Sequence, residues 1–150
     1  MKKIIISILI SSFGFSQSSL ELDIWAKDAT IKSFEMFRKI LSIPNDANQL
    51  DDIELNVRWC EEKFIDRGFI TKRINTPKAP LLLAERIFSK ANETVLIYLQ
   101  IDGQPVDPSR WFQENPYEPV LKKQNTQGHW EIIDWNNIVN YEDDWRIFAR

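Results

Sequence analysis

Gln100 and Asp102 are the side chains of this sequence that are best placed to do chemistry together. They stand at the end of residues 94–101 (TVLIYLQI), a nearly continuous apolar run that is typical of a central strand buried on both faces. Side chains two positions apart on an extended chain point to the same side, and open α/β sheets place ligands and catalytic groups at the carboxyl ends of their strands. We therefore predict that Gln100 and Asp102 can address one site. The alternative, which the pattern alone favours, is that Asp102 only caps the loop that begins at Gly103.

Two other reactive side chains are weaker candidates. Cys60 is the only cysteine, so the chain forms no internal disulfide, and the helical pattern around it predicts a buried thiol that acts as a small hydrophobe. A nucleophilic Cys60 would need His129, the only histidine, as its partner. As a metal ligand, His129 has only Glu131 and Asp134 near it in the sequence. We interpret His129 as a turn residue.

The elements that must position these residues are two helices followed by three strands. The predicted ranges are helices 28–43 and 51–67 and strands 69–74, 81–87 and 94–101. Pro44 ends the first helix, and Gly68 follows the last turn of the second. We expect a layered α/β fold in which two amino-terminal helices pack on a mixed sheet with at least one parallel pair of strands. From Asp102 onward, many Pro, Trp, Asn and Asp residues predict an irregular, aromatic-rich region with short strands.

Composition and the first residues narrow the class of protein. A chain of 150 residues, 43% hydrophobic and 27% charged, is expected to fold as one globular domain. The net charge of -3 and the lack of a basic stripe argue against nucleic-acid binding. Lys2 and Lys3 precede a short apolar run, residues 4–15, which predicts a signal peptide over residues 1–16. That run is too short for a stable membrane anchor, so we expect an exported protein, periplasmic or secreted.

Residues 95–119 (VLIYLQIDGQPVDPSRWFQENPYEP) resemble the first metal-site region of a large family of cocatalytic zinc enzymes. This family includes carnosinase-like dipeptidases, aminoacylases and succinyl-diaminopimelate desuccinylases. Its members carry a buried strand ending in G-H-x-D-x-x-P-V, and then a tryptophan followed by P-F-x-P. The matching residues are Asp102, Pro105 and Val106 in the first motif and Trp111, Pro116, Tyr117 and Pro119 in the second, where Tyr117 replaces phenylalanine. The preceding order of helices and strands is also similar, so the resemblance covers most of residues 17–150.

The resemblance implies a hydrolase that cleaves dipeptides or N-acyl amino acids with the help of two zinc ions. By this resemblance Asp102 is the catalytic-site carboxylate that orients a metal ligand. Gln100 stands at the metal position where the family has its first ligand histidine. A neutral amide is a poorer zinc ligand than imidazole, so this departure puts one zinc position in doubt.

A second departure concerns the remaining zinc ligands. Family members continue with G-R-G-x-x-D-x-K-G, whose aspartate bridges the two zinc ions, and residues 147–150 (IFAR) resemble the beginning of that motif. Residues 17–150 therefore resemble only part of a catalytic domain, whereas a zinc site needs three or four ligands. We expect this chain alone to be inactive and to bind zinc incompletely. An incomplete sheet also leaves an open edge, which predicts marginal stability or self-association.

The alternative hypothesis is a non-catalytic, exported binding module. Exposed aromatic side chains can stack on sugars or contact another protein, and the final third of the chain is rich in them. The tryptophans concerned are Trp111, Trp130, Trp135 and Trp145. The competing interpretation, which we favour, is that these side chains pack over the hydrophobic core.

Overall fold

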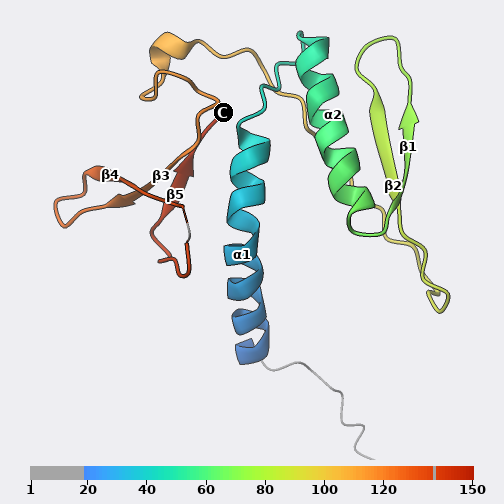
Figure 1. Ribbon diagram of the computed structural model, residues 1–150, viewed down its shortest axis with the longest axis horizontal. Coiled ribbons are helices and arrows are strands. Elements are labelled where there is room, and N and C mark those ends of the chain that lie inside the picture. The colour runs from blue at the N-terminus through green and yellow to red at the C-terminus, as the bar shows by residue number, and fades with distance from the viewer. Residues whose placement is uncertain (1–18, 137) are drawn as a thin grey trace, which may run out of the picture.

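The chain combines helices with small antiparallel sheets, which confirms the predicted mixture of α and β structure. The computed structural model describes residues 19–136 and 138–150 (Figure 1). Its elements are α1 (Ser19–Leu41), α2 (Leu50–Ile65), β1 (Ile70–Ile74), β2 (Leu81–Glu85), the 3-10 helix η1 (Pro108–Arg110), β3 (Val120–Gln124), β4 (Trp130–Ile133) and β5 (Arg146–Phe148). In Figure 1, α1 lies between the two sheets. The predicted signal peptide, residues 1–16, lies outside the described residues.

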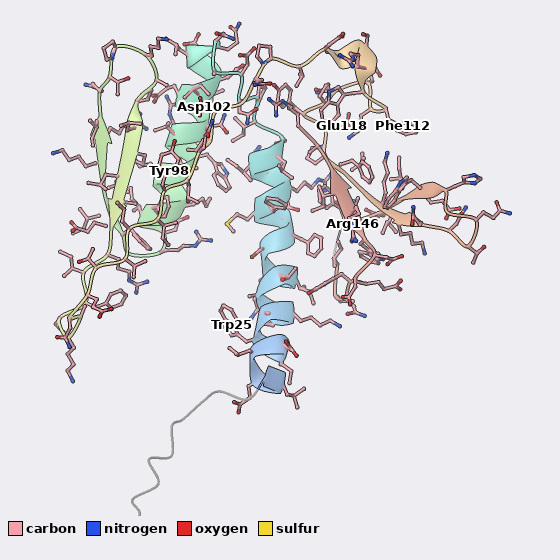
Figure 2. The ribbon with its side chains drawn as sticks, turned by 180° about the vertical axis from the view of Figure 1, so that it is seen from behind. Trp25, Tyr98, Asp102, Phe112, Glu118 and Arg146 are labelled. Carbon is pink, nitrogen blue, oxygen red and sulfur yellow. The ribbon has the colours of Figure 1, made fainter. Side chains whose placement is uncertain are left out.

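The first helix is longer than its amphipathic pattern predicted. It covers Ser19–Leu41, and its first turns contain Leu20, Glu21, Leu22 and Ala26, residue types that favour a helix even where they bury little. Trp25, in these turns, is 69% exposed and projects from the helix (Figure 2). The helix ends at Leu41, shortly before Pro44, since a residue that precedes proline disfavours the helical conformation. No helix within the described ranges is long and apolar enough to cross a membrane.

The second helix and the β1–β2 hairpin form one packed unit. Ile53 and Val57 on α2 are buried, with exposed fractions of 3% and 2%. Gly68 ends the helical region with a φ of 77°, a left-handed conformation that glycine adopts without steric cost. In the hairpin, β1 pairs antiparallel with β2, and Ile70 lies opposite Glu85.

An ion-pair cluster ties this hairpin to α2. The Arg73 guanidinium on β1 lies 2.7 Å from Glu61 Oε2 and 2.5 Å from Glu54 Oε1. Thr71 Oγ1 also donates to Glu61, at 3.3 Å. The hydrogen bond from Arg73 holds the pKa of the Glu61 carboxyl below its usual range.

Residues 94–101, which we call the apolar segment, do not form the predicted central strand. The side chains from Val95 to Leu99 are 69–86% exposed. Within the described chain, no backbone group of residues 94–100 takes part in a hydrogen bond. The apolar composition correctly indicates a need for burial. A central strand, however, also requires a paired strand on each side, and the described residues supply neither.

The second sheet has the order β4-β3-β5, and both of its pairings are antiparallel. Leu121 on β3 is 1% exposed. Phe34 on α1 packs against this half of the chain, with ring centroids 6.5 Å from Trp135 and 6.0 Å from Tyr141. The predicted parallel pair of strands is wrong for the described residues, whose only parallel pairing is an isolated bridge between Asp46 and Gly103.

The chain exposes more surface than a self-contained domain of its mass. A folded monomer of 17.7 kDa has about 7,900 Å² of accessible surface, whereas this chain has 13,018 Å². Granting residues 1–18 the full surface of an unfolded chain accounts for about 2,900 Å² of this difference, which leaves about 2,000 Å². The buried hydrophobic residues within the described ranges are Ile53, Val57, Leu121 and Trp135. The described residues thus leave much apolar surface uncovered.

Candidate functional site

Three chain segments that are distant in the sequence meet at one end of the molecule. Asn45 follows α1, Gly103 follows the apolar segment, and Arg150 follows β5 (Figure 1). The Gly103 N–H donates to the Asn45 carbonyl at 2.7 Å, and the Asn45 side-chain amide donates to the Ile101 carbonyl at 2.9 Å. These bonds fix the loop that carries Asp102 against the turn between α1 and α2.

Arg150 links the segments that resemble the zinc-peptidase motifs. We call these segments the motif stretches, residues 102–106, 111–119 and 147–150. The Arg150 guanidinium donates through Nη2 to the carbonyl of Gln104, in the first motif stretch. The Arg150 backbone N–H donates to the carbonyl of Pro116, in the second, at 2.9 Å. One residue therefore holds all three motif stretches together.

Gly103 is the point of closest approach in this junction. A Cβ atom at this position would lie 2.7 Å from Arg150 Nη2 and 3.2 Å from Asn45 Oδ1. Only glycine leaves room for the guanidinium in its observed place. Asn45 Oδ1 and Arg150 Nε are both buried without a hydrogen-bond partner among the described residues.

Gln100 and Asp102 lie beside this junction, and both side chains are exposed. Asp102 is found at the end of the molecule where α2 begins (Figure 2). Gln100 Nε2 lies 3.5 Å from the Asp102 carbonyl oxygen, which is a weak hydrogen bond at most. The Gln100 side chain therefore lies near the Asp102 backbone, and within the described residues no hydrogen bond joins the two side chains. The loop-capping alternative is not what the structure shows, because the described chain has no hydrogen bond to the Asp102 carboxylate and Asn45 holds the loop instead.

The described side chains around Gln100 and Asp102 do not fit a zinc ion. Among the residues that the structure describes, no group of three or more His, Cys, Asp or Glu side chains could hold a metal. Gln100 offers an amide, and Asp102 is the single carboxylate of the first motif stretch. A tetrahedral site with nitrogen or sulfur ligands cannot be assembled from these two side chains.

His129 is a turn residue, in agreement with the sequence interpretation. It closes the β3–β4 hairpin, where its N–H donates to Asn125 Oδ1 at 3.0 Å and its carbonyl accepts from the Asn125 N–H at 2.9 Å. Cys60 is partly buried on α2, and burial raises the pKa of its thiol, which disfavours the reactive thiolate. Figure 1 places α2 and this hairpin on opposite sides of α1, so Cys60 and His129 form no catalytic pair.

Sequence reasoning missed one buried charge. Lys122 on β3 is 4% exposed, and its Nζ lies 4.0 Å from the ring centroid of Phe112 and 4.5 Å from that of Phe148. Two aromatic faces thus take the place of a carboxylate partner. The only available signal was that a lysine interrupts the apolar positions of a short strand.

The aromatic residues of the final third mostly pack inward. Trp135 is 8% exposed and stacks edge-on against Phe34. Trp130 is 42% exposed and contacts Phe148, with ring centroids 5.1 Å apart. A groove of about 620 Å³ runs between α1 and the β3–β4 hairpin, where Arg38 donates to Asn136 Oδ1 at 2.8 Å.

Comparison with known proteins leaves the family open. No protein-family model matches the chain, and neither the curated proteins nor the solved structures gave a significant match.

Proposed function

We propose that this chain is the amino-terminal part of an exported zinc peptidase of the dipeptidase and aminoacylase type. The complete enzyme hydrolyses dipeptides or N-acyl amino acids, and its zinc ions supply an activated water. We expect the 150-residue chain to lack this activity by itself, because no group of three or more His, Cys, Asp or Glu side chains among its described residues could hold a metal ion. Its contribution is to position Asp102 and Gln100 at the edge of the catalytic centre.

The observation that carries the proposal is the meeting of the three motif stretches at Arg150. A resemblance spread over separate segments of sequence has functional meaning only if the segments come together in space. Here Arg150 bonds to Gln104 and to Pro116, and both partners lie within the motif stretches. A chain continuing from Arg150 would therefore start beside the loop that carries Asp102, which is where further ligands are needed.

The uncovered apolar surface gives independent support. An exposed apolar segment of the composition that normally forms a buried strand is expected of a chain that supplies only part of a sheet. About 2,000 Å² of excess surface, beyond what residues 1–18 could contribute, is consistent with the same interpretation.

Sequencing the coding DNA beyond the codon for Arg150 tests the proposal directly. The expected result is an open frame that continues into an S-x-x-D-x-K-G-like motif and later carboxylate and histidine ligands. Its full product should hydrolyse dipeptides or N-acyl amino acids, lose activity to a chelator and regain it with zinc. A stop codon directly after Arg150, or chelator-sensitive hydrolysis by the purified 150-residue chain, would overturn the proposal.

An exported binding module is the second candidate, and exposed aromatic side chains favour it. Phe112 and Tyr98 are 84% and 82% exposed, on the two loops that flank Asp102 (Figure 2). Tryptophan emission, titrated with a panel of glycans, checks this candidate. Trp111 directly precedes Phe112 in the chain, so its emission should respond to a ligand bound there. A saturable shift would favour the binding module over the peptidase fragment.

A further inference from the structure

The groove between α1 and the β3–β4 hairpin contains an arginine that has no acidic partner. Arg38 is half-buried in the last turn of α1, and its guanidinium lies over the ring of Trp135, 5.3 Å from the ring centroid. Its Nη1 donates to Asn136 Oδ1 at 2.8 Å. Within the described residues, the Arg38 side chain makes no other hydrogen bond and no ion pair. Most of the N–H donors of this guanidinium are therefore left for a ligand.

The contacts around Arg38 orient its guanidinium before any ligand binds. Trp135 is 8% exposed, so the ring under the guanidinium belongs to the core. Asn136 is held in turn by Asp134, whose Oδ1 accepts from the Asn136 N–H at 2.9 Å and from its side-chain amide at 2.6 Å. A guanidinium that is stacked on an aromatic ring and bonded to a neutral amide keeps its charge and loses little freedom on binding. Its planar fork matches a carboxylate, which accepts two parallel hydrogen bonds from it.

The two sides of the groove carry opposite charge. On α1, Arg38 and Lys39 outnumber Glu35, whereas the other side carries Asp134 and Glu118, which lies in the loop before β3 (Figure 2). Within the described chain, none of these charged side chains takes part in an ion pair. The volume of about 620 Å³ lies within the usual range for small-molecule sites, about 300–1,000 Å³. Apolar side chains also line the groove: Pro119, Val120, Leu121, Ile132 and Ile133.

We propose that this groove binds a small zwitterion, an amino acid or a short peptide with free ends. Its carboxylate pairs with Arg38, and its ammonium group lies toward Glu118 and Asp134. The acidic side of the groove disfavours a ligand that is only an anion, and the α1 side disfavours one that is only a cation. A neutral ligand would leave the guanidinium without a partner. The inference rests on the groove residues and holds whether or not the complete protein is a peptidase.

A series of matched ligands tests the chemistry of the groove on the unchanged 150-residue chain. Leucine, glycyl-leucine, glycyl-leucine amide and N-acetyl-glycyl-leucine are titrated into the chain in a calorimeter. Removing the carboxylate charge, as in the amide, should weaken binding at least about tenfold relative to glycyl-leucine. Removing the ammonium charge should weaken it about threefold, because the acidic side chains are more exposed. Comparing leucine with glycyl-leucine then shows whether the groove takes an amino acid or a peptide.

Two results of this series would overturn the proposal. One is equal binding of glycyl-leucine and its amide, because Arg38 would then not recognise a carboxylate. The other is the absence of saturable binding of both leucine and glycyl-leucine up to about 10 mM. The titration measures binding and not hydrolysis, so either result leaves the proposed peptidase untouched.

Substitutions locate the ligand in the groove. Arg38→Gln should weaken binding of glycyl-leucine at least about tenfold, and Arg38→Lys should not restore it, because lysine lacks the planar fork. Glu118→Gln should weaken binding of glycyl-leucine and leave that of N-acetyl-glycyl-leucine unchanged. Glu114→Gln is the matched control, since Glu114 is exposed and does not line the groove. Full binding by Arg38→Gln, or equal losses in Glu114→Gln and Glu118→Gln, would refute this location.

Discussion

Replacing Gly103 with alanine should loosen the junction of the motif stretches. The new Cβ would lie 2.7 Å from Arg150 Nη2, so the flexible guanidinium must move and its bond to the Gln104 carbonyl is lost. A hydrogen bond from a charged group contributes about 1.5–3 kcal/mol, and the partial exposure of this one places it near the lower value. Alanine also has less conformational entropy than glycine in the unfolded chain, which offsets about 0.5 kcal/mol of this destabilisation. The expected net destabilisation is about 1 kcal/mol.

A double-mutant cycle isolates the contact responsible. In an Arg150→Ala chain the guanidinium is already absent, so Gly103→Ala should cost nothing or stabilise slightly. The expected coupling energy between the two substitutions is about 1.5 kcal/mol. Substitutions at independent sites have additive effects to within about 0.3–0.5 kcal/mol, so a coupling of this size is detectable. Urea unfolding followed by tryptophan emission measures all four chains, at a dilution where sedimentation shows monomers. Additive effects would refute the view that Gly103 is needed for the approach of Arg150.

Three further results are expected. Phe34→Ala should lower the free energy of unfolding by about 2–3 kcal/mol, since it removes two aromatic contacts, whereas Phe37→Ala, at a residue 48% exposed, should cost less than about 1 kcal/mol in the same denaturant titration. The Arg73 hydrogen bond lowers the pKa of Glu61 in the folded chain. The stabilisation that this bond gives the folded state is therefore complete above about pH 4.3, the pKa of Glu in the unfolded chain, and is lost as the pH falls through the lower pKa of the folded chain. Glu61→Gln should therefore flatten the acid dependence of thermal stability, and an unchanged slope, or an equal effect of Glu62→Gln, would contradict this. Zinc should leave the unfolding midpoint of the 150-residue chain unchanged. If the folded chain had a zinc site, a zinc concentration one hundred times its Kd would add about 2.7 kcal/mol to the free energy of unfolding.

The elements that the sequence predicted well are those with local signals. Asp51 and Asp52 favour the first turn of α2, and Gly68 supplies the left-handed residue after it. Strands were predicted at 69–74 and 81–87, and β1 and β2 lie within these ranges, but their antiparallel pairing as a hairpin was not predicted. The helical turns before residue 28 were missed. Their apolar side chains, such as Trp25, are exposed and form no buried apolar stripe, which is the feature that hydrophobic periodicity detects.

The features that could not be predicted depend on contacts between distant parts of the chain. An apolar run such as residues 94–101 indicates that burial is favourable, but it cannot say what covers the run. The junction of Asn45, Gly103 and Arg150 likewise joins segments with no local relationship in sequence. That Gln100 and Asp102 address one site stays a prediction, since the structure shows only a weak contact from the Gln100 side chain to the Asp102 carbonyl.

The unpaired apolar segment also determines how this chain is cut. Proteases take up their substrates as extended, unpaired backbone, and exposed loops are the preferred sites of nicking. A chymotrypsin-like protease should therefore cleave first at Tyr98 or Leu99, with no prior unfolding. The Asn45–Gly103 bond and the Phe34–Trp135 contact then hold the two pieces together. The nicked chain should migrate as one particle under native conditions and as two fragments in detergent.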